Sequence, residues 1–237
     1  MSDYKNFKLV IKAKKTPIVN NPLIEYIKGE NEHLYCDIYY NETLISKGVI
    51  LDFYKEFENK TFLIFNEYTD ISTFEWRGKR YTKNTYFGQK IFEIKNFINP
   101  PLDKKKREAY LNEIVNYFNP YIKNLIKRNI VPTISYVPSS LRIPNDIAHK
   151  LAALNNLKIV HIIKKNSNLQ SKTLTTINSQ SFNKYIVNFQ GIDKSNTFLI
   201  IDDVVGTGAT FCEIMYKFYK FNQKINFFLA VVKDVKR

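Results

Sequence analysis

The 237-residue chain has few cysteines, glycines and prolines, and it lacks any long apolar run. Its two cysteines, Cys36 and Cys212, are too few for a disulfide scaffold or a four-cysteine zinc site. Seven glycines and eight prolines exclude a collagen-like or linker-like chain. No stretch approaches the roughly 18 apolar residues of a membrane span, and the charged start does not resemble a signal peptide. We therefore expect a reduced, cytoplasmic protein with no membrane partner.

Positive charge is present in excess, and it is concentrated in the second part of the chain. Lys and Arg number 36 against 22 Asp and Glu, which gives a net charge of +14. Residues 1–100 hold 15 basic and 13 acidic residues, whereas residues 101–237 hold 21 and 9. Such a field favours nucleic acid, an anionic membrane surface or a phosphate-rich small molecule. A solvated, lysine-rich surface explains the charge equally well.

Residues 1–100 are predicted to form a β-rich domain of unknown role. Apolar–polar alternation predicts strands at Phe7–Ala13, Leu34–Tyr40, Thr43–Leu51, Thr61–Phe65 and Gln89–Ile98, with turns at residues 41–42 and within 76–81. Aromatic residues are dense in this region. Most are expected in the core, and a platform that stacks nucleobases is the alternative.

Residues 101–237 are predicted to form an α/β domain, a parallel sheet flanked by helices. Asp103 should cap a helix that extends to Ile126, and Pro120 should kink or split that helix. Strands and helices then alternate, as is typical of a parallel sheet. The predicted strands are 133–137, 158–163, 185–189, 197–201 and 225–232, and the predicted helices are 145–154, capped by Asn145, and 210–221. The polar segment 166–183 is predicted to be a long loop that acts as a lid.

The segment Phe198–Thr210, FLIIDDVVGTGAT, carries the most chemical information. Two acids, Asp202 and Asp203, follow an apolar strand. A loop of small residues then leads into a helix: Gly206, Thr207, Gly208, Ala209 and Thr210. Backbone N–H groups of such a loop and the positive helix end form a site sized for a phosphate. Carboxylates at a strand's carboxyl end can accept hydrogen bonds from two neighbouring hydroxyls. A phosphate site beside a diol site matches a ribose 5-phosphate.

Other phosphate-binding motifs do not fit this segment. The nucleotide P-loop requires a lysine after its last glycine, but Ala209 follows Gly208. The dinucleotide fingerprint GxGxxG fails because Phe211 occupies its last position. An ordinary strand–turn–helix connection is the alternative, but two adjacent acids at a buried strand end are costly without a function.

On these residues the chain resembles the type I phosphoribosyltransferases, whose motif for 5-phosphoribosyl 1-pyrophosphate (PRPP) is similar to FLIIDDVVGTGAT. The resemblance extends over about residues 131–237. It is closest to the ComF-like group because of the segment Tyr136–Arg142, YVPSSLR. The resemblance implies a Mg²⁺-dependent reaction in which an unidentified nucleobase-type acceptor displaces pyrophosphate from PRPP. Mg²⁺ would arrive bound to PRPP and would not be held in a protein cage.

The resemblance also implies roles for individual residues. Asp202 and Asp203 would be catalytic, holding the ribose hydroxyls and stabilising positive charge on the sugar. Residues 206–210 would bind the 5-phosphate. Pyrophosphate would be bound by three residues after the first strand of this region: Ser139, Ser140 and Arg142. The lid would bring two cations: Lys172 and Lys184. The β-rich domain would form a hood that reads the base.

Two interpretations stay open. The alternative to an enzyme is a ComF-like protein, of a group associated with DNA uptake, that binds PRPP or nucleotide without turnover, or binds nucleic acid through its basic second part. The intact motif favours the enzyme, whereas the scarcity of arginine in the pyrophosphate segment and lid favours the alternative. Gly206 stands where the 6-oxopurine transferases carry an acid, which argues against purine salvage of that kind. The assembly is open, with a homodimer among the alternatives.

The remaining candidate residues are interpreted as structural. His33, His149 and His161 are far apart in sequence and lack the spacing of metal ligands. Cys212 lies in the first turn of the helix after the loop, where a thiol pKa can fall, but we expect a packed, unreactive thiol.

Overall fold

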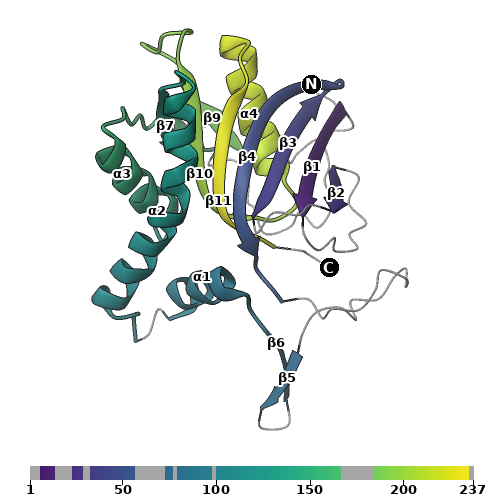
Figure 1. Cartoon of the computed structure of the whole chain (residues 1–237), viewed down its shortest axis with the longest axis vertical. Helices are drawn as coiled ribbons and strands as arrows, with labels where there is room; N and C mark the ends of the chain where they lie inside the picture. Colours follow the sequence, from purple (N-terminus) through teal and green to yellow (C-terminus); the bar gives the residue numbers. More distant parts are fainter. Residues whose placement is uncertain are drawn as a thin grey trace.

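The computed structural model describes residues 6–13, 23–28, 33–56, 73–76, 79–97, 100–166 and 184–234. A seven-stranded sheet forms its centre, in the order β2-β1-β3-β4-β11-β10-β7 (Figure 1). Its strands are β1 (Phe7–Ala13), β2 (Ile24–Lys28), β3 (Leu34–Tyr40), β4 (Thr43–Phe53), β7 (Pro132–Tyr136), β10 (Thr197–Val205) and β11 (Asn226–Lys233). The neighbours β4, β11, β10 and β7 run parallel, and β3 is antiparallel to both β1 and β4. The predicted parallel sheet flanked by helices is confirmed.

The predicted boundary at residue 100 does not divide this sheet. β4 pairs with β11 along its length, with Val49 opposite Leu229. The ring of Phe228 on β11 lies 2.4 Å from where a Cβ of Gly48 would stand, so only glycine fits at this position of β4. Strands from both sides of residue 100 therefore share one sheet, and their side chains share one core.

The predicted hairpin at residues 34–51 is confirmed. Asn41 and Glu42 connect β3 to β4 with φ angles of +45° and +63°. Positive φ at both residues is the geometry of the two-residue turn that matches the twist of paired strands. Strands on either side of residues 77–78 are confirmed as well, since β5 (Thr73–Trp76) pairs antiparallel with β6 (Lys79–Thr82). The strand predicted at 61–65 lies outside the described residues.

The strand predicted at 89–98 is wrong, because this segment belongs to the helix α1 (Tyr86–Asn96). Thr85 caps the helix, and its Oγ1 accepts a hydrogen bond from the N–H of Gly88 at 3.0 Å. Phe87, Ile91 and Ile94 are spaced by four and three residues and are all buried. That spacing places them on one helical face, which packs against the sheet.

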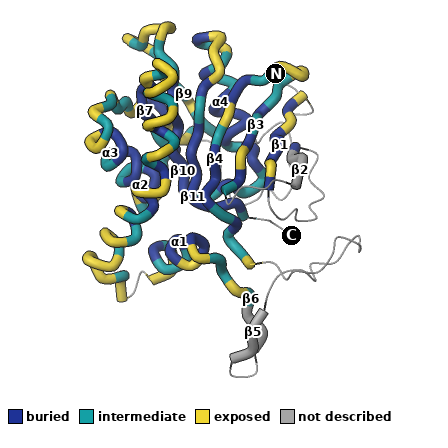
Figure 2. Tube along the Cα trace, in the orientation of Figure 1, coloured by how far each residue is buried: buried dark blue, intermediate teal, exposed yellow. Residues whose placement is uncertain are grey.

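Helices cover both faces of the sheet (Figures 1 and 2). α1, α2 (Lys104–Lys127) and α3 (Ile143–Asn155) pack on one face, and α4 (Ala209–Asn222) packs on the other. Ile91, Phe118 and Ile147 are fully buried on the first face, and Phe211 and Phe218 are buried on the second. No helix in the described ranges is both long enough and apolar enough to cross a bilayer.

The helix boundaries confirm some predictions and correct others. Asp103 caps α2, accepting a hydrogen bond from the N–H of Lys106 at 3.1 Å. α2 is not split at Pro120, which lies on its exposed side inside the helix. The proline removes one backbone hydrogen bond, and packing of the apolar face compensates for it. The predicted cap at Asn145 is wrong, since α3 begins at Ile143.

The strand predicted at 158–163 is only partly formed. Ile159 makes a single parallel bridge with Ile134 of β7. A separate strand, β8 (Ile163–Lys165), then pairs with β9 (Tyr185–Val187). The predicted lid between these strands falls almost entirely on residues 167–183, which lie outside the described part of the chain.

Candidate functional site

Asp202 and Asp203 lie inside β10, near its carboxyl end. The prediction that this strand ends at Ile201 is wrong, because pairing with β11 continues as far as Val205. On the other side β7 stops earlier, and its last paired residue, Tyr136, lies opposite Ile201. Both acids therefore lie where one edge of β10 is no longer paired with β7.

The two carboxylates leave β10 on opposite faces of the sheet. Side chains alternate along a strand, and here Ile200 lies in the core beneath α4 while Ile201 lies in the core beneath α1 to α3. Asp202 accordingly faces the α4 side and Asp203 faces the α1 side. Their exposed fractions are only 7% and 5%.

Asp202 is a buried acid with a strongly altered pKa. Burial raises the pKa of Asp202 well above its ordinary value, and the charge of Asp203 adds to the rise. Its Oδ1 accepts a hydrogen bond from the backbone N–H of Asp203 at 2.8 Å. Burial, followed by the charge of Asp202, raises the pKa of Tyr185 to about 12, and Tyr185 also shares a hydrogen bond with the Thr210 side chain. Tyr185 thus lies near the acid and is hydrogen-bonded to the first turn of α4.

Asp203 is paired with a cation from a different part of the chain. The Nζ of Lys95, on α1, lies 2.9 Å from Asp203 Oδ2. Tyr54 lies near the same carboxylate, and burial together with the charges of Asp234 and Asp203 raises its pKa to about 12. Sequence reasoning missed Lys95 because it assigned this segment to a strand.

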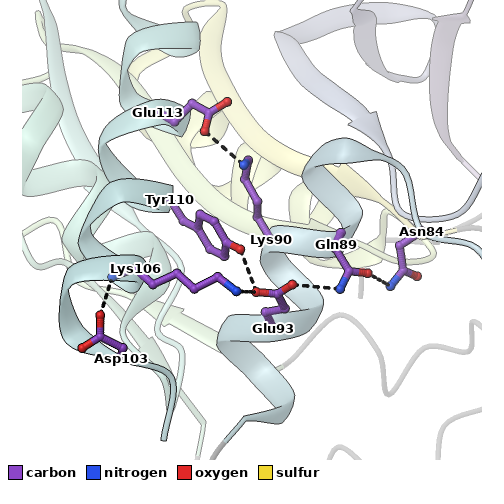
Figure 3. A network of polar contacts seen from close by, with 8 residues as sticks. All are labelled: Asn84, Gln89, Lys90, Glu93, Asp103, Lys106, Tyr110 and Glu113. Atoms are coloured by element: carbon purple, nitrogen blue, oxygen red, sulfur yellow. Dashed lines mark hydrogen bonds and ion pairs between the residues drawn. The ribbon is translucent and has the colours of Figure 1, made fainter.

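A network of charged side chains holds α1 against α2 (Figure 3). The ammonium of Lys90 lies 3.0 Å from a carboxylate oxygen of Glu113, and that of Lys106 lies 2.8 Å from Glu93. Each pair joins one helix to the other. Because α2 is itself packed on the sheet, the network fixes the direction in which α1 presents Lys95 to the strand below.

The loop after β10 ends in a glycine with a left-handed backbone. Gly208 is the cap residue of α4 and has a φ of +83°, which glycine adopts without strain. No side chain caps α4, although the N–H of Ala209 makes a long contact of 3.4 Å with Thr207 Oγ1. An N-terminus with this geometry presents N–H groups and a positive dipole to an anion. The predicted location of residues 206–210 at the start of a helix is confirmed, and their binding of a phosphate stays a prediction.

A buried lysine at the end of β11 is hydrogen-bonded to this loop. Lys233, the last residue of β11, donates hydrogen bonds from Nζ to the carbonyl oxygens of Gly206 at 2.7 Å and Asp234 at 2.6 Å. Its exposed fraction is 1%. The loop conformation is therefore tied to the end of β11. A lysine at the end of an otherwise apolar strand is the sequence signal that could have revealed it.

The residues predicted to bind pyrophosphate lie in the connection between β7 and α3. Ser140 and Arg142 line a hollow of about 470 Å³ together with Arg107, Leu141 and Asp146. Arg107, on α2, donates hydrogen bonds to the Leu141 carbonyl at 3.1 Å and to Asp146 Oδ2 at 2.7 Å. Ser139 lies in the same turn, where its carbonyl accepts a hydrogen bond from the Arg142 N–H at 3.2 Å. The structure thus brings a second arginine to this segment, from a helix that sequence reasoning did not connect with it.

The two lid lysines have different outcomes. Lys172 lies outside the described residues. Lys184 is the first described residue after the predicted lid. The backbone N–H groups of Lys184 and Tyr185 donate to the buried carboxylate of Glu213, at 3.3 and 3.0 Å. Cys212 is fully buried, which confirms the expected packing, and burial raises the pKa of its thiol to about 12.

Comparisons with known proteins return structures and no sequence relatives. No family model matches the chain, and no curated protein matches it. An adenine phosphoribosyltransferase is 12% identical, with 69% of this chain and 84% of that chain covered and a TM-score of 0.40. The adenine phosphoribosyltransferase of Thermoanaerobacter pseudethanolicus is also 12% identical, with coverages of 69% and 95% and a TM-score of 0.39. The hypoxanthine phosphoribosyl transferase of Trypanosoma cruzi is 16% identical, with coverages of 52% and 60% and a TM-score of 0.36. Likeness at this level does not assign the chain to a family.

Proposed function

We propose that the chain binds PRPP and transfers its phosphoribosyl group to a nucleobase-type acceptor. One observation carries the proposal. Two buried carboxylates near the carboxyl end of a central parallel strand are followed within a few residues by the uncapped, glycine-led N-terminus of α4. This order supplies acceptors for sugar hydroxyls beside donors for a phosphate, at the edge where parallel α/β sheets bind ligands.

The chemistry follows from the two halves of the site. The loop of residues 206–210 would hold the 5-phosphate. Lys233 would keep the backbone of this loop in place through its hydrogen bond to the Gly206 carbonyl. The acceptor nitrogen would form a bond to C1 of the ribose as the bond from C1 to the pyrophosphate oxygen breaks. Pyrophosphate would leave with that electron pair, and the proton of the acceptor N–H would pass to solvent. Positive charge builds on the ribose ring during this step. Asp202 and Asp203 would stabilise it, since buried carboxylates act more strongly than exposed ones.

The leaving group would be bound by the connection between β7 and α3. Arg142 lies at the hollow there, and Arg107 adds a second guanidinium. Guanidinium groups and serine hydroxyls suit phosphate oxygens. Mg²⁺ belongs to the substrate in this proposal, because Asp202 and Asp203 point to opposite faces of the sheet and do not form a cage of oxygen ligands.

The proposal is tested by measuring pyrophosphate release from Mg·PRPP with a panel of purine and pyrimidine bases. Asp203→Asn should lower release at least about 100-fold, because it removes a negative charge beside the reacting ring. Asp193→Asn is the matched control, since it makes the same change at an exposed loop residue and should leave the rate unchanged. Absence of release with every base would exclude the transferase and leave the non-catalytic alternative.

A further inference from the structure

Three residues that are separated in the sequence lie together beside β7: Tyr136, His149 and His161. Tyr136 ends β7, His149 is on α3, and His161 follows the bridge at Ile159. The ring centroids of the two histidines are 5.5 Å apart. The Oη of Tyr136 lies 2.6 Å from Nδ1 of His161. Both imidazoles are exposed. The interpretation of these histidines as structural, based on their distance in sequence, did not anticipate this arrangement.

Rigid elements hold both rings in place. On α3, the neighbours Ala148 and Leu151 are fully buried, so the helix that carries His149 is packed on the sheet. Before His161, the backbone is fastened to Ile134 of β7. The Val160 N–H donates to the Ile134 carbonyl at 2.9 Å, and the Ile134 N–H donates to the Lys158 carbonyl at 2.8 Å. Ligands on packed helices and strands keep their geometry without a bound ion.

We propose that His149 and His161 together bind a divalent transition-metal ion, with Zn²⁺ as the representative case. Zn–N distances of about 2.0–2.1 Å in a tetrahedral site place the centroids of two coordinating imidazoles roughly 5 Å apart, close to the separation observed. The contact between Tyr136 and Nδ1 of His161 leaves Nε2 of that ring for the metal. A partner on the second nitrogen fixes the tautomer and orientation of a metal-binding histidine.

Among the histidines and cysteines of the chain, His149 and His161 are the pair whose rings lie together. The full sequence contains three histidines and two cysteines. Cys36 and Cys212 are buried, and burial raises the pKa of both thiols. His33 lies elsewhere, with Nδ1 at 3.1 Å from the Leu51 carbonyl. Within the described ranges no group of three His, Cys, Asp or Glu residues could hold a metal. Two imidazoles therefore leave the remaining coordination positions open to water or to an anionic ligand.

This site is independent of the proposed function, because it uses neither the acids of β10 nor the loop before α4. Arg142 and Asp146 act electrostatically on Tyr136, so charged groups of the β7–α3 connection lie near the pair. Asp146 is itself held by Arg107 at 2.7 Å. Metal binding is measured without PRPP, so failure of either proposal leaves the other intact.

The first test follows the imidazole resonances of the full chain by ¹H–¹⁵N NMR during titration with Zn²⁺. With three histidines in the sequence, each ring is resolved separately. We expect the resonances of His149 and His161 to shift together and saturate at one equivalent, while those of His33 stay in place. Equal shifts of all three rings, or no shift up to about 1 mM Zn²⁺, would overturn the proposal.

The second test compares Zn²⁺ affinities of variants by calorimetry. His149→Ala and His161→Ala should each weaken binding by at least about tenfold, and Tyr136→Phe should weaken it by up to about tenfold through loss of the second-nitrogen partner. His33→Ala is the matched control and should bind as the unchanged chain does. Unchanged affinity in either of the first two variants, or a loss in the control, would contradict the assignment. Both changed rings are exposed, and far-UV circular dichroism checks that the variants fold.

Discussion

Asp202 and Asp203 are adjacent on β10 and similarly buried, but their surroundings on the two faces of the strand differ. On the α1 side, Asp203 has the ammonium of Lys95 at 2.9 Å. On the α4 side, Asp202 faces Tyr185, and burial raises the pKa of Asp202 well above its ordinary value. Lys95 pairs directly with Asp203, whereas its charge acts on Asp202 as a lesser cause that does not offset the effect of burial. A buried acid whose pKa stays raised is typical of sites where binding or chemistry requires it.

The largest expected effect on stability comes from removing the ion pair between Lys95 and Asp203. Lys95→Met leaves the carboxylate of Asp203 buried without its cation, which should lower the free energy of unfolding by about 1–3 kcal/mol in urea denaturation. The expected loss is smaller than for a fully buried ion pair because the Lys95 side chain is 30% exposed. The double variant Lys95→Met/Asp203→Asn should recover most of the loss.

Lys150→Met is the matched control for this experiment, because it breaks an ion pair between α3 and α2 that does not involve α1. The partner in that pair is Glu108, whose side chain is 53% exposed, so the loss should be smaller than that caused by Lys95→Met. Equal losses in the two single variants, or no recovery in the double variant, would show that the ion pair with Asp203 has no special role.

Changing Asp202, on the α4 face, should have the opposite effect on stability. Because the pKa of Asp202 is raised in the folded chain, the folded state binds a proton more tightly than the unfolded state. Stability is therefore lost as pH rises from about 4 through that raised pKa. Asp202→Asn removes the titration and should stabilise the chain at neutral pH by about 1–3 kcal/mol, with the gain disappearing below about pH 4.

The control variant for Asp202→Asn should change stability in the opposite direction. Ser195 hydrogen bonds lower the pKa of Asp193, so Asp193→Asn should slightly destabilise the chain at neutral pH. Thermal denaturation of both variants between pH 3 and 8 measures the difference. Destabilisation by Asp202→Asn at neutral pH would mean that Asp202 is a structural acid, and the contrast between the faces would disappear.

The smallest expected effect concerns Tyr185, which lies between Asp202 and the first turn of α4. Tyr185→Phe removes the hydrogen bond with Thr210 and should cost about 0.5–1.5 kcal/mol in thermal denaturation. Tyr117→Phe, at a tyrosine that is 43% exposed, is the control and should have no measurable effect. If both variants behave alike, the hydrogen bond between Tyr185 and Thr210 contributes nothing to stability.

Local patterns in the sequence predicted the strand, loop and helix around residues 198–210 because an apolar run, small residues and helical spacing follow one another. They did not predict that β10 continues through both acids, since polar residues remain in a strand when a neighbour such as β11 pairs with them. Helix α1 was missed although the Thr85 cap and the spacing of Phe87, Ile91 and Ile94 were present, because the dense aromatic and branched residues of the region favoured strands.

The partners of the site could not be read from the sequence. Lys95, Arg107 and Lys233 reach it from α1, α2 and the end of β11. Such contacts depend on how helices pack on the sheet, which no local pattern encodes. The pairing of β4 with β11 is of the same kind, because it joins segments at opposite ends of the chain.

Calorimetric titration of Mg·PRPP tests the central claim most directly. The unchanged chain should bind one equivalent with measurable heat, and Asp202→Asn should lose that binding although it is the more stable protein. No heat with the unchanged chain, or equal binding by Asp202→Asn, would contradict the claim that the buried acids of β10 and the loop before α4 form a PRPP site.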